Sequence, residues 1–291
     1  MKKFHKISIG AAQFGMKYSL GASTKLTKSE IEKILSYAEE MGIDSIDTAS
    51  NYGSSEEILG KIGIKNWKVT SKLSSVPKDC IDIQSWIKNE LVLTLKNLKI
   101  ESIDSLLLHR PHQLVSNIGS EICLALDNLK KDGLIKKHGI STYNNEDIDK
   151  YIELYNFDVI QAPCNIVDKN IVESGAAAKY RKKGKTIQAR SVFLQGLLLS
   201  YKHQNSKKFS RWNPFWSDFN AWLSDNKISP LKACINYVYS LNDIDKLVIG
   251  VLSQGQLKEV LNCIDTINLK MPDFSIEDKE LLINPSNWNL L

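Results

Sequence analysis

Residues 105–141 read SLLLHRPHQLVSNIGSEICLALDNLKKDGLIKKHGIS, and this stretch decides the fold. A short apolar run at 105–109 is followed by a helical stretch at 118–132 and by a second short run at 137–141. Gly133 closes the helical stretch, and glycine is common just beyond a helix end because it adopts the left-handed conformation easily. The segment therefore predicts one strand–helix–strand unit of a parallel sheet.

The same unit recurs along the whole chain. Strands are predicted at 6–10, 43–47, 67–72, 105–109, 137–141, 158–162, 186–190 and 246–250. Helices are predicted at 28–41, 55–62, 83–98, 118–132, 145–155, 173–183, 230–240 and 255–263, the first with Thr27 and Glu30 as a capping box. Eight such units predict an α/β protein, a closed (β/α)₈ TIM barrel forming a single domain over residues 1–291. A doubly wound sheet is the competing fold, but IGAAQFG at 9–15 does not match its glycine-rich first turn.

One connection breaks the regular pattern. Residues 191–229 are too long for a simple turn, so we predict a lid or substrate loop there, and a C-terminal tail from about residue 264. Six aromatic residues lie within 209–222. They could stack on a sugar or aromatic ligand, but we favour the interpretation that they fasten the segment to the barrel.

Composition excludes several classes of protein. Hydrophobic residues make up 43% of the 291 and charged residues 24%, which is typical of a globular protein with a large core. No apolar run is long enough to span a membrane and the first residues lack a signal peptide, so a cytoplasmic location is expected. Four of the 38 basic residues are arginines, which argues against a nucleic-acid partner. Five scattered cysteines without a CxxC pair predict reduced thiols rather than disulfides or a metal site.

Polar residues end six consecutive predicted strands. They are Asp47, Lys72, His109, Ser141, Gln161 and Arg190. In a barrel the carboxyl ends of the strands meet at one mouth, where the chemistry of this fold is found. We therefore predict a functional site at this mouth.

Asp47, Lys72 and the nearby Tyr52 suggest a specific chemistry. A tyrosine has an ordinary pKa near 10, which is too high for easy proton exchange at neutral pH. A lysine ammonium beside the phenol favours the phenolate, and an aspartate keeps that lysine charged and oriented. We expect this trio to perform acid–base catalysis, with His109 donating a hydrogen bond to a substrate carbonyl oxygen.

Six segments in order resemble the aldo-keto reductase family, and IGAAQFGMKYSLG at 9–21 resembles a bacterial branch of it. The six segments are DTASNYGSSEEILGKI at 47–62, VTSK at 69–72, SIDSLLLHRP at 102–111, LKKDGLIKKHGIS at 129–141, FDVIQAPCNIVD at 157–168 and IGVLSQGQLKEVL at 249–261. The resemblance implies an NAD(P)H-dependent oxidoreductase that reduces a carbonyl to an alcohol. Tyr52 would be the general acid, Asp47 and Lys72 would tune it, and His109 would orient the substrate.

The resemblance also implies how a nicotinamide cofactor is held. Ser141 and Gln161 match positions that bind the carboxamide, with Asp47, Thr142 and Arg190 beside them. The other implied contacts are Ser191, Phe193, Leu194 and Gly196 for the pyrophosphate, and Gly250, Ser253, Gln256 and Glu259 for the adenosine. The segment at 191–194 lacks the usual proline, and neither Leu252 nor Gln256 is the basic residue that would pair with a 2′-phosphate. NADP(H) is favoured narrowly over NAD(H).

Other functions stay open at this point. The main alternative is a non-catalytic NAD(P)H-binding regulatory subunit on the same fold. A barrel lyase or isomerase with Lys72 as a Schiff base is a third hypothesis. The partner is expected to be a small-molecule carbonyl substrate, carbohydrate-like by the resemblance of residues 9–21 to the bacterial branch. The oligomeric state and the direction of the reaction are left open.

Overall fold

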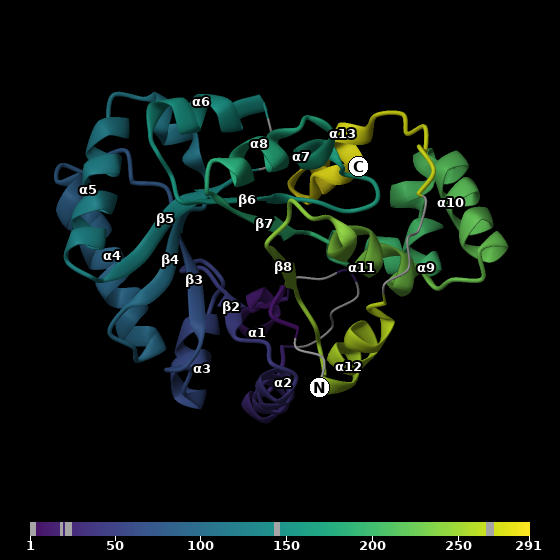
Figure 1. Cartoon of the computed structure of the whole chain (residues 1–291), viewed down its shortest axis with the longest axis horizontal. Coiled ribbons are helices and arrows are strands. Elements are labelled where there is room, and N and C mark those ends of the chain that lie inside the picture. The colour runs from purple at the N-terminus through teal and green to yellow at the C-terminus, as the bar shows by residue number, and fades with distance from the viewer. Residues whose placement is uncertain (1–3, 18–19, 21–24, 143–145, 266–270) are drawn as a thin grey trace.

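The eight strands close into a parallel barrel in chain order (Figure 1). The computed structural model describes residues 4–17, 20, 25–142, 146–265 and 271–291. The strands are β1 (Ile7–Gly10), β2 (Ser45–Asp47), β3 (Lys68–Leu73), β4 (Ile103–Leu108), β5 (Ile135–Ser141), β6 (Val159–Pro163), β7 (Thr186–Arg190) and β8 (Lys246–Ile249). Ser8 pairs with Val248, which joins the first strand to the last. The predicted (β/α)₈ barrel is confirmed.

Helices follow the strands and surround the barrel. They are α1 (Ala12–Gly15), α2 (Lys28–Glu40), α3 (Ser55–Ile62), α4 (Ile83–Leu98), α5 (Gly119–Lys131), α6 (Glu146–Leu154), α7 (Asn170–Glu173), α8 (Ala176–Lys182), α11 (Pro230–Ser240) and α12 (Gln254–Cys263), with the 3₁₀ turn η1 (Pro111–Val115) after β4. The predicted capping box of Thr27 and Glu30 is present at the start of α2. The helix predicted at 173–183 is divided, because Gly175 has a φ of +75° between α7 and α8.

The segment predicted as a long loop at 191–229 is instead largely helical. It contains η2 (Leu194–Leu199), α9 (Tyr201–Gln204), η3 (Lys207–Trp212) and α10 (Asn213–Asp225). Pro214 lies in the first turn of α10, where its missing N–H leaves no helical bond unmade. Apart from the adjacent Phe215 and Trp216, the aromatic residues follow one another at intervals of three, so one face of the segment is apolar. In Figure 1 α9 and α10 lie at the right, outside the ring of helices.

The aromatic face of this insertion belongs to a second hydrophobic core. Five of the six aromatic side chains within residues 209–222 are buried, and Trp222 is partly buried. The C-terminal segment covers them, as α13 (Lys279–Ile283) and η4 (Pro285–Leu290) add Leu282, Ile283 and Trp288. Phe274 packs edge-on against Phe215 and Phe219. These contacts favour a packing role for the aromatic residues over a ligand-stacking role.

Throughout the part of the chain that the structure describes, no helix has both the length and the apolar character needed to span a membrane.

Candidate active site

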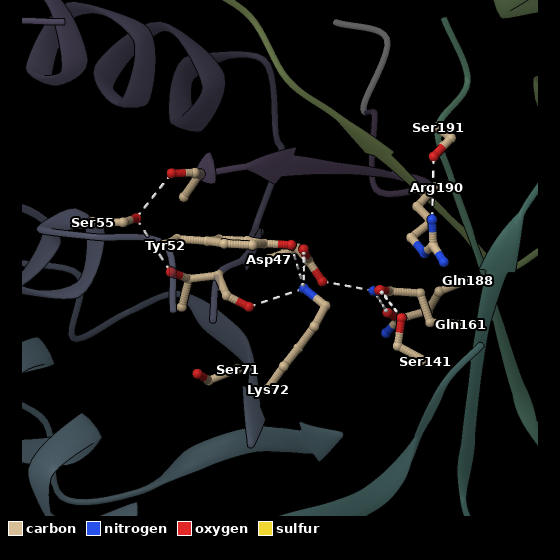
Figure 2. A network of polar contacts seen from close by, with 12 residues as sticks. Asp47, Tyr52, Ser55, Ser71, Lys72, Ser141, Gln161, Gln188, Arg190 and Ser191 are labelled. Atoms are coloured by element: carbon tan, nitrogen blue, oxygen red, sulfur yellow. Dashed lines mark hydrogen bonds and ion pairs between the residues drawn. The ribbon is translucent and has the colours of Figure 1, made fainter. Parts of the chain in front are cut away.

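A buried ion pair lies at the mouth of the barrel (Figure 2). The Nζ atom of Lys72, near the end of β3, is 2.5 Å from Oδ2 of Asp47, which ends β2. It also donates to the backbone carbonyl of Thr48 at 2.9 Å. The side chains of Lys72 and Asp47 are 0% and 5% exposed. Because charges lose much solvation when they are buried, such a pair persists only when each partner compensates the other.

Tyr52 extends over this pair from the loop between β2 and α3. Lys72 Nζ lies 3.4 Å from the phenol oxygen and 5.0 Å from the centre of the tyrosine ring. The backbone here is held by a close approach to α1, since a Cβ on Gly15 would come within 1.8 Å of the Tyr52 carbonyl oxygen. Only glycine fits at that position. The sequence therefore places the phenol, the ammonium and the carboxylate in one connected group.

His109 follows β4 and faces the tyrosine. The two rings meet edge to face, with centroids 5.8 Å apart. Burial, together with the charges of Lys72, Arg190 and Arg110, lowers the pKa of His109 to about 3. The imidazole is therefore neutral near pH 7. The Nδ1 atom of His109 is buried and has no hydrogen-bond partner within the described residues. Unpaired buried polar atoms are rare in native proteins, so this atom is a candidate contact for a bound ligand.

A chain of amides continues from Asp47 across the mouth. Gln161 on β6 donates to Asp47 Oδ1 at 2.6 Å and to Gln188 Oε1 at 3.0 Å, and it accepts from Ser141 Oγ at 3.1 Å. All four side chains are buried. The structure thus brings together Asp47, Ser141 and Gln161, as the sequence predicted, and adds Gln188.

Arg190 ends β7 on the far side of this chain. Its Nη2 donates to the Thr142 carbonyl at 3.0 Å and its Nη1 lies 3.3 Å from Ser191 Oγ. Thr142 itself is buried. These contacts fix the guanidinium across the ends of β5 and β7, beside the amide chain (Figure 2).

A cavity of about 320 Å³ opens beside Tyr52 and runs towards α12. The predicted site residues that line it are Asp47, Tyr52, Arg190, Ser191, Phe193, Gly196, Gly250, Gln256 and Glu259. Lys72, His109, Ser141, Thr142, Gln161, Leu194 and Ser253 are not among the lining residues that the structure describes. Leu194 is buried in the second core, and Ser253 caps α12 by accepting from the Gln256 N–H at 3.1 Å.

The backbone after β7 is suited to a ligand with phosphate groups. Ser191, Leu194, Gln195 and Gly196 all have φ between +46° and +89°, a conformation that non-glycine residues rarely adopt. Strained residues of this kind cluster at ligand clamps, and turns that mix right- and left-handed residues form concave sites for anions. Ser191, Gln195 and Gly196 line the cavity. The residues present therefore fit a dinucleotide that extends from the strained turn towards α12.

The sequence reasoning missed Gln13 and Gln188. Gln188 lies two residues before Arg190 on β7, and side chains two apart on a strand share one face, so the alternation could have revealed it. Gln13 lines the cavity from α1, and a Cβ on Gly250 would come within 2.2 Å of its amide nitrogen. Gln13 comes just after the first strand, at the barrel mouth, and this position in the sequence could have revealed it as a site residue.

A sequence model of the Aldo/keto reductase family matches residues 6–279, nearly the whole chain. The chain belongs to the aldo-keto reductase family. Among curated proteins it is 30% identical over 162 residues to the aldo-keto reductase YhdN of Bacillus subtilis, a match covering 50% of this chain and 47% of that protein. It is 29% identical over 184 residues to an NADH-specific methylglyoxal reductase of Escherichia coli, covering 55% and 56%. The chain thus spans about half the length of the curated relatives it matches.

Solved aldo-keto reductases share the fold over a longer stretch. One from Bacillus halodurans, in its holo form, superposes with a TM-score of 0.71 at 18% identity and covers 91% of this chain and 88% of that one. A glycerol dehydrogenase from Gluconobacter oxydans gives a TM-score of 0.68 at 22% identity, covering 89% and 86%. At these identities the likeness shows the fold alone.

Proposed function

We propose that this aldo-keto reductase reduces a small carbonyl compound to an alcohol with a nicotinamide cofactor, and that Tyr52 is its general acid. The observation that carries the proposal is the connected group of Asp47, Lys72 and Tyr52 at the edge of the cavity. A non-catalytic binding subunit would have no need of a proton donor held in this way.

Each side chain has a separate task in the proposed reaction. The Tyr52 phenol donates a proton to the carbonyl oxygen, and the Lys72 ammonium stabilises the phenolate that remains. Asp47 holds that ammonium in position and compensates its charge. Neutral His109 donates a hydrogen bond to the same carbonyl oxygen and so polarises the carbonyl.

The cofactor residues are assigned by combining the family resemblance, which gives Ser141 and Gln161, with the lining of the cavity, which includes Asp47, Ser191 and Gly196. Gln161, Ser141 and Asp47 would hold the carboxamide end, the strained turn containing Ser191 and Gly196 the pyrophosphate, and the start of α12 the adenosine. A nicotinamide cofactor, when bound, supplies the hydride that reduces the carbonyl carbon.

The α12 end of the cavity favours NADH. Gln256 and Glu259 line this end, and the Gln256 side chain accepts a hydrogen bond from the Leu252 N–H at 2.7 Å. A carboxylate accepts hydrogen bonds from a ribose 2′-hydroxyl but repels a 2′-phosphate. The sequence alone favoured NADP(H), whereas Glu259 shifts our proposal to NAD(H). One relative is named as an NADH-specific reductase, which agrees with this choice.

The proposed substrate is a small oxygenated carbonyl. Relatives are named as a methylglyoxal reductase and a glycerol dehydrogenase, which supports this class. The buried aromatic residues of α10 give no support for a sugar-stacking platform. A carbohydrate-like substrate would have to be recognised by the polar residues around Tyr52.

The test is oxidation of NADH and NADPH, followed by absorbance, with a panel of small aldehydes, hydroxyketones and sugars. The proposal expects turnover with at least one carbonyl and faster turnover with NADH. Cofactor binding without turnover on any of them would favour the regulatory alternative. A borohydride-trapped adduct on Lys72 would favour the Schiff-base hypothesis, although this buried ammonium is committed to three oxygens.

A further inference from the structure

Gln13 presents an uncommitted side-chain amide to the cavity. It belongs to α1 and lines the cavity together with Tyr52 and Gly250. Its side chain is partly exposed, and within the described residues neither the amide nitrogen nor the amide oxygen has a hydrogen-bond partner. A glutamine amide carries N–H donors and a carbonyl acceptor. This one can therefore bind a polar ligand without giving up a contact in the protein.

The backbone that carries Gln13 is held on both sides. Before it, the Ser55 hydroxyl donates a hydrogen bond to the Ala11 carbonyl at 2.9 Å. After it, Gly15 lies so close to the Tyr52 carbonyl oxygen that no Cβ fits between them. The position of the amide is therefore set by the torsions of the glutamine side chain alone.

Gly250, which follows β8, leaves the space that this amide occupies. A Cβ on Gly250 would lie 2.2 Å from the Gln13 amide nitrogen, 2.5 Å from its oxygen and 2.7 Å from its carbon. The φ angle of Gly250 is not positive, so the backbone conformation does not require a glycine there. The requirement is for space. Because the amide ends a flexible side chain, an alanine at position 250 would displace the amide rather than the backbone.

The order of the strands places the amide along the cavity. Strand β1, which precedes Gln13, pairs with β2 on one side and with β8 on the other. The reacting group with Tyr52 follows β2, and α12 follows β8. Gln13 therefore lies between the reacting end and the α12 end. The Leu20 N–H donates to the Gln195 carbonyl at 3.1 Å, so the chain beyond α1 also reaches the strained turn after β7.

The middle of a bound dinucleotide is its pyrophosphate, which is anionic and accepts hydrogen bonds. Among the cavity-lining residues that the structure describes, Arg190 is the only basic one. Most of the hydrogen bonds to a pyrophosphate here must therefore come from neutral donors. An amide N–H is such a donor, and hydrogen bonds to charged acceptors are stronger than those between neutral groups.

We propose that the Gln13 amide donates a hydrogen bond to the pyrophosphate of the cofactor, and that residue 250 is a glycine because the amide needs its space. This inference rests on the proposed function. Gln13 would hold the pyrophosphate from the β1 side of the cavity, while the strained turn approaches it from the β7 side.

The experiment measures dissociation constants by isothermal titration calorimetry without any substrate. The ligands are NADH and ADP-ribose, which keeps the pyrophosphate but lacks the nicotinamide. Gln13→Ala removes the amide, Gln13→Glu replaces its donor with a carboxylate, and Gly250→Ala displaces it. The double variant Gln13→Ala/Gly250→Ala tests whether the glycine acts through the amide. Gln84→Ala and Gln84→Glu, at an exposed position of α4, are the matched controls.

Both ligands should respond alike. Loss of a hydrogen bond to a charged group weakens binding, so Gln13→Ala and Gly250→Ala should each raise both dissociation constants about tenfold. Gln13→Glu should raise them at least about 30-fold, because a carboxylate repels the pyrophosphate. The double variant should bind no more than about threefold more weakly than either single variant, because both changes remove the same contact. The Gln84 variants should leave both constants unchanged. Near-ultraviolet circular dichroism establishes that each variant is folded.

Unchanged constants in Gln13→Ala would overturn the inference. A loss for NADH that ADP-ribose does not show would also overturn it, because the amide would then contact the nicotinamide. Normal binding by Gln13→Glu would point to a ribose hydroxyl instead of the pyrophosphate, and losses that multiply in the double variant would show that Gly250 acts independently of Gln13. Each of these results leaves the proposed function intact. If wild type binds neither NADH nor NADPH, the proposed function itself fails.

Discussion

Lys72 Nζ lies 2.5 Å from Asp47 Oδ2 in a place that solvent does not reach. Asp47 ends β2, and Lys72 lies one residue before the end of the neighbouring strand β3. The pairing of these two strands brings Asp47 opposite Thr70. The barrel therefore fixes the pair before any ligand arrives. This preorganised charge is what the proposed proton transfer depends on.

Breaking this pair should be costly. Lys72→Met leaves the Asp47 carboxylate buried without its cation, and loss of one partner of a buried pair costs about 3–5 kcal/mol. We expect urea denaturation to show a loss of this size, together with a large fall in kcat and a shift of the alkaline limb of the pH–rate profile to higher pH.

Lys68→Met is the matched control for that experiment. Lys68 starts the same strand and lies 2.6 Å from Asp44 Oδ2, but it is exposed. Exposed pairs contribute about 0–1 kcal/mol. If Lys72→Met were no more destabilising than Lys68→Met, the buried pair would not have the role assigned to it.

His109 links stability to pH in a defined direction. Its pKa is about 3 in the folded protein, against about 6.5 in an unfolded chain. Between these values the unfolded chain binds more protons, so the contribution of His109 is complete above about pH 6.5 and decreases as the pH falls. We expect His109→Gln to lose less thermal stability than wild type when the pH is lowered from about 7 to about 5.

Asp168 acts in the opposite direction in the same range, because burial raises its pKa to about 6. The contribution of Asp168 is the same in wild type and in His109→Gln, so the difference between their losses of thermal stability measures the contribution of His109. Equal losses in wild type and His109→Gln would show that the imidazole is not held neutral.

Glu259 should control the choice of cofactor. Replacing its carboxylate with an ammonium in Glu259→Lys removes the repulsion of a 2′-phosphate and adds an attraction. We expect the ratio of NADPH to NADH affinity to rise by at least about tenfold in fluorescence titrations. Glu57→Lys on the exposed face of α3 is the control and should leave the ratio unchanged. An unchanged ratio in Glu259→Lys would place the adenosine elsewhere.

Phe219 tests the packing role of the insertion. It is fully buried in the second core between Phe215 and Phe274, so Phe219→Ala should cost about 3–5 kcal/mol in the free energy of unfolding. Trp222→Ala should cost less, because Trp222 is only partly buried. A marked rise in KM from Phe219→Ala without a loss of stability would instead support direct contact with substrate.

The barrel and much of the site could be predicted from the sequence because both depend on local patterns. Strand-sized apolar runs and helix-length periodic segments alternate, and Thr27 and Glu30 mark a helix start by side-chain chemistry alone. Parallel strands bring their carboxyl ends together in any such barrel. Asp47, Lys72 and Gln161 therefore had to meet once the fold was known.

The insertion could not be predicted in the same way. Its aromatic residues have helical spacing, but their burial depends on Phe274 and Trp288, which come from the C-terminal segment. Such a contact between distant parts of the chain leaves no mark in local periodicity. The left-handed backbone conformation of Ser191 and Leu194 could not be predicted from the sequence for a related reason. Non-glycine residues adopt it only when the surrounding packing imposes it.

The most direct test of the central claim is Tyr52→Phe, which removes one oxygen atom and leaves the ring in place. The account predicts that kcat for carbonyl reduction falls about 100- to 10,000-fold, while the dissociation constant of NADH, titrated in parallel, changes by less than about threefold. A variant that binds NADH normally and retains the wild-type kcat would show that Tyr52 is not the proton donor, and would contradict the account.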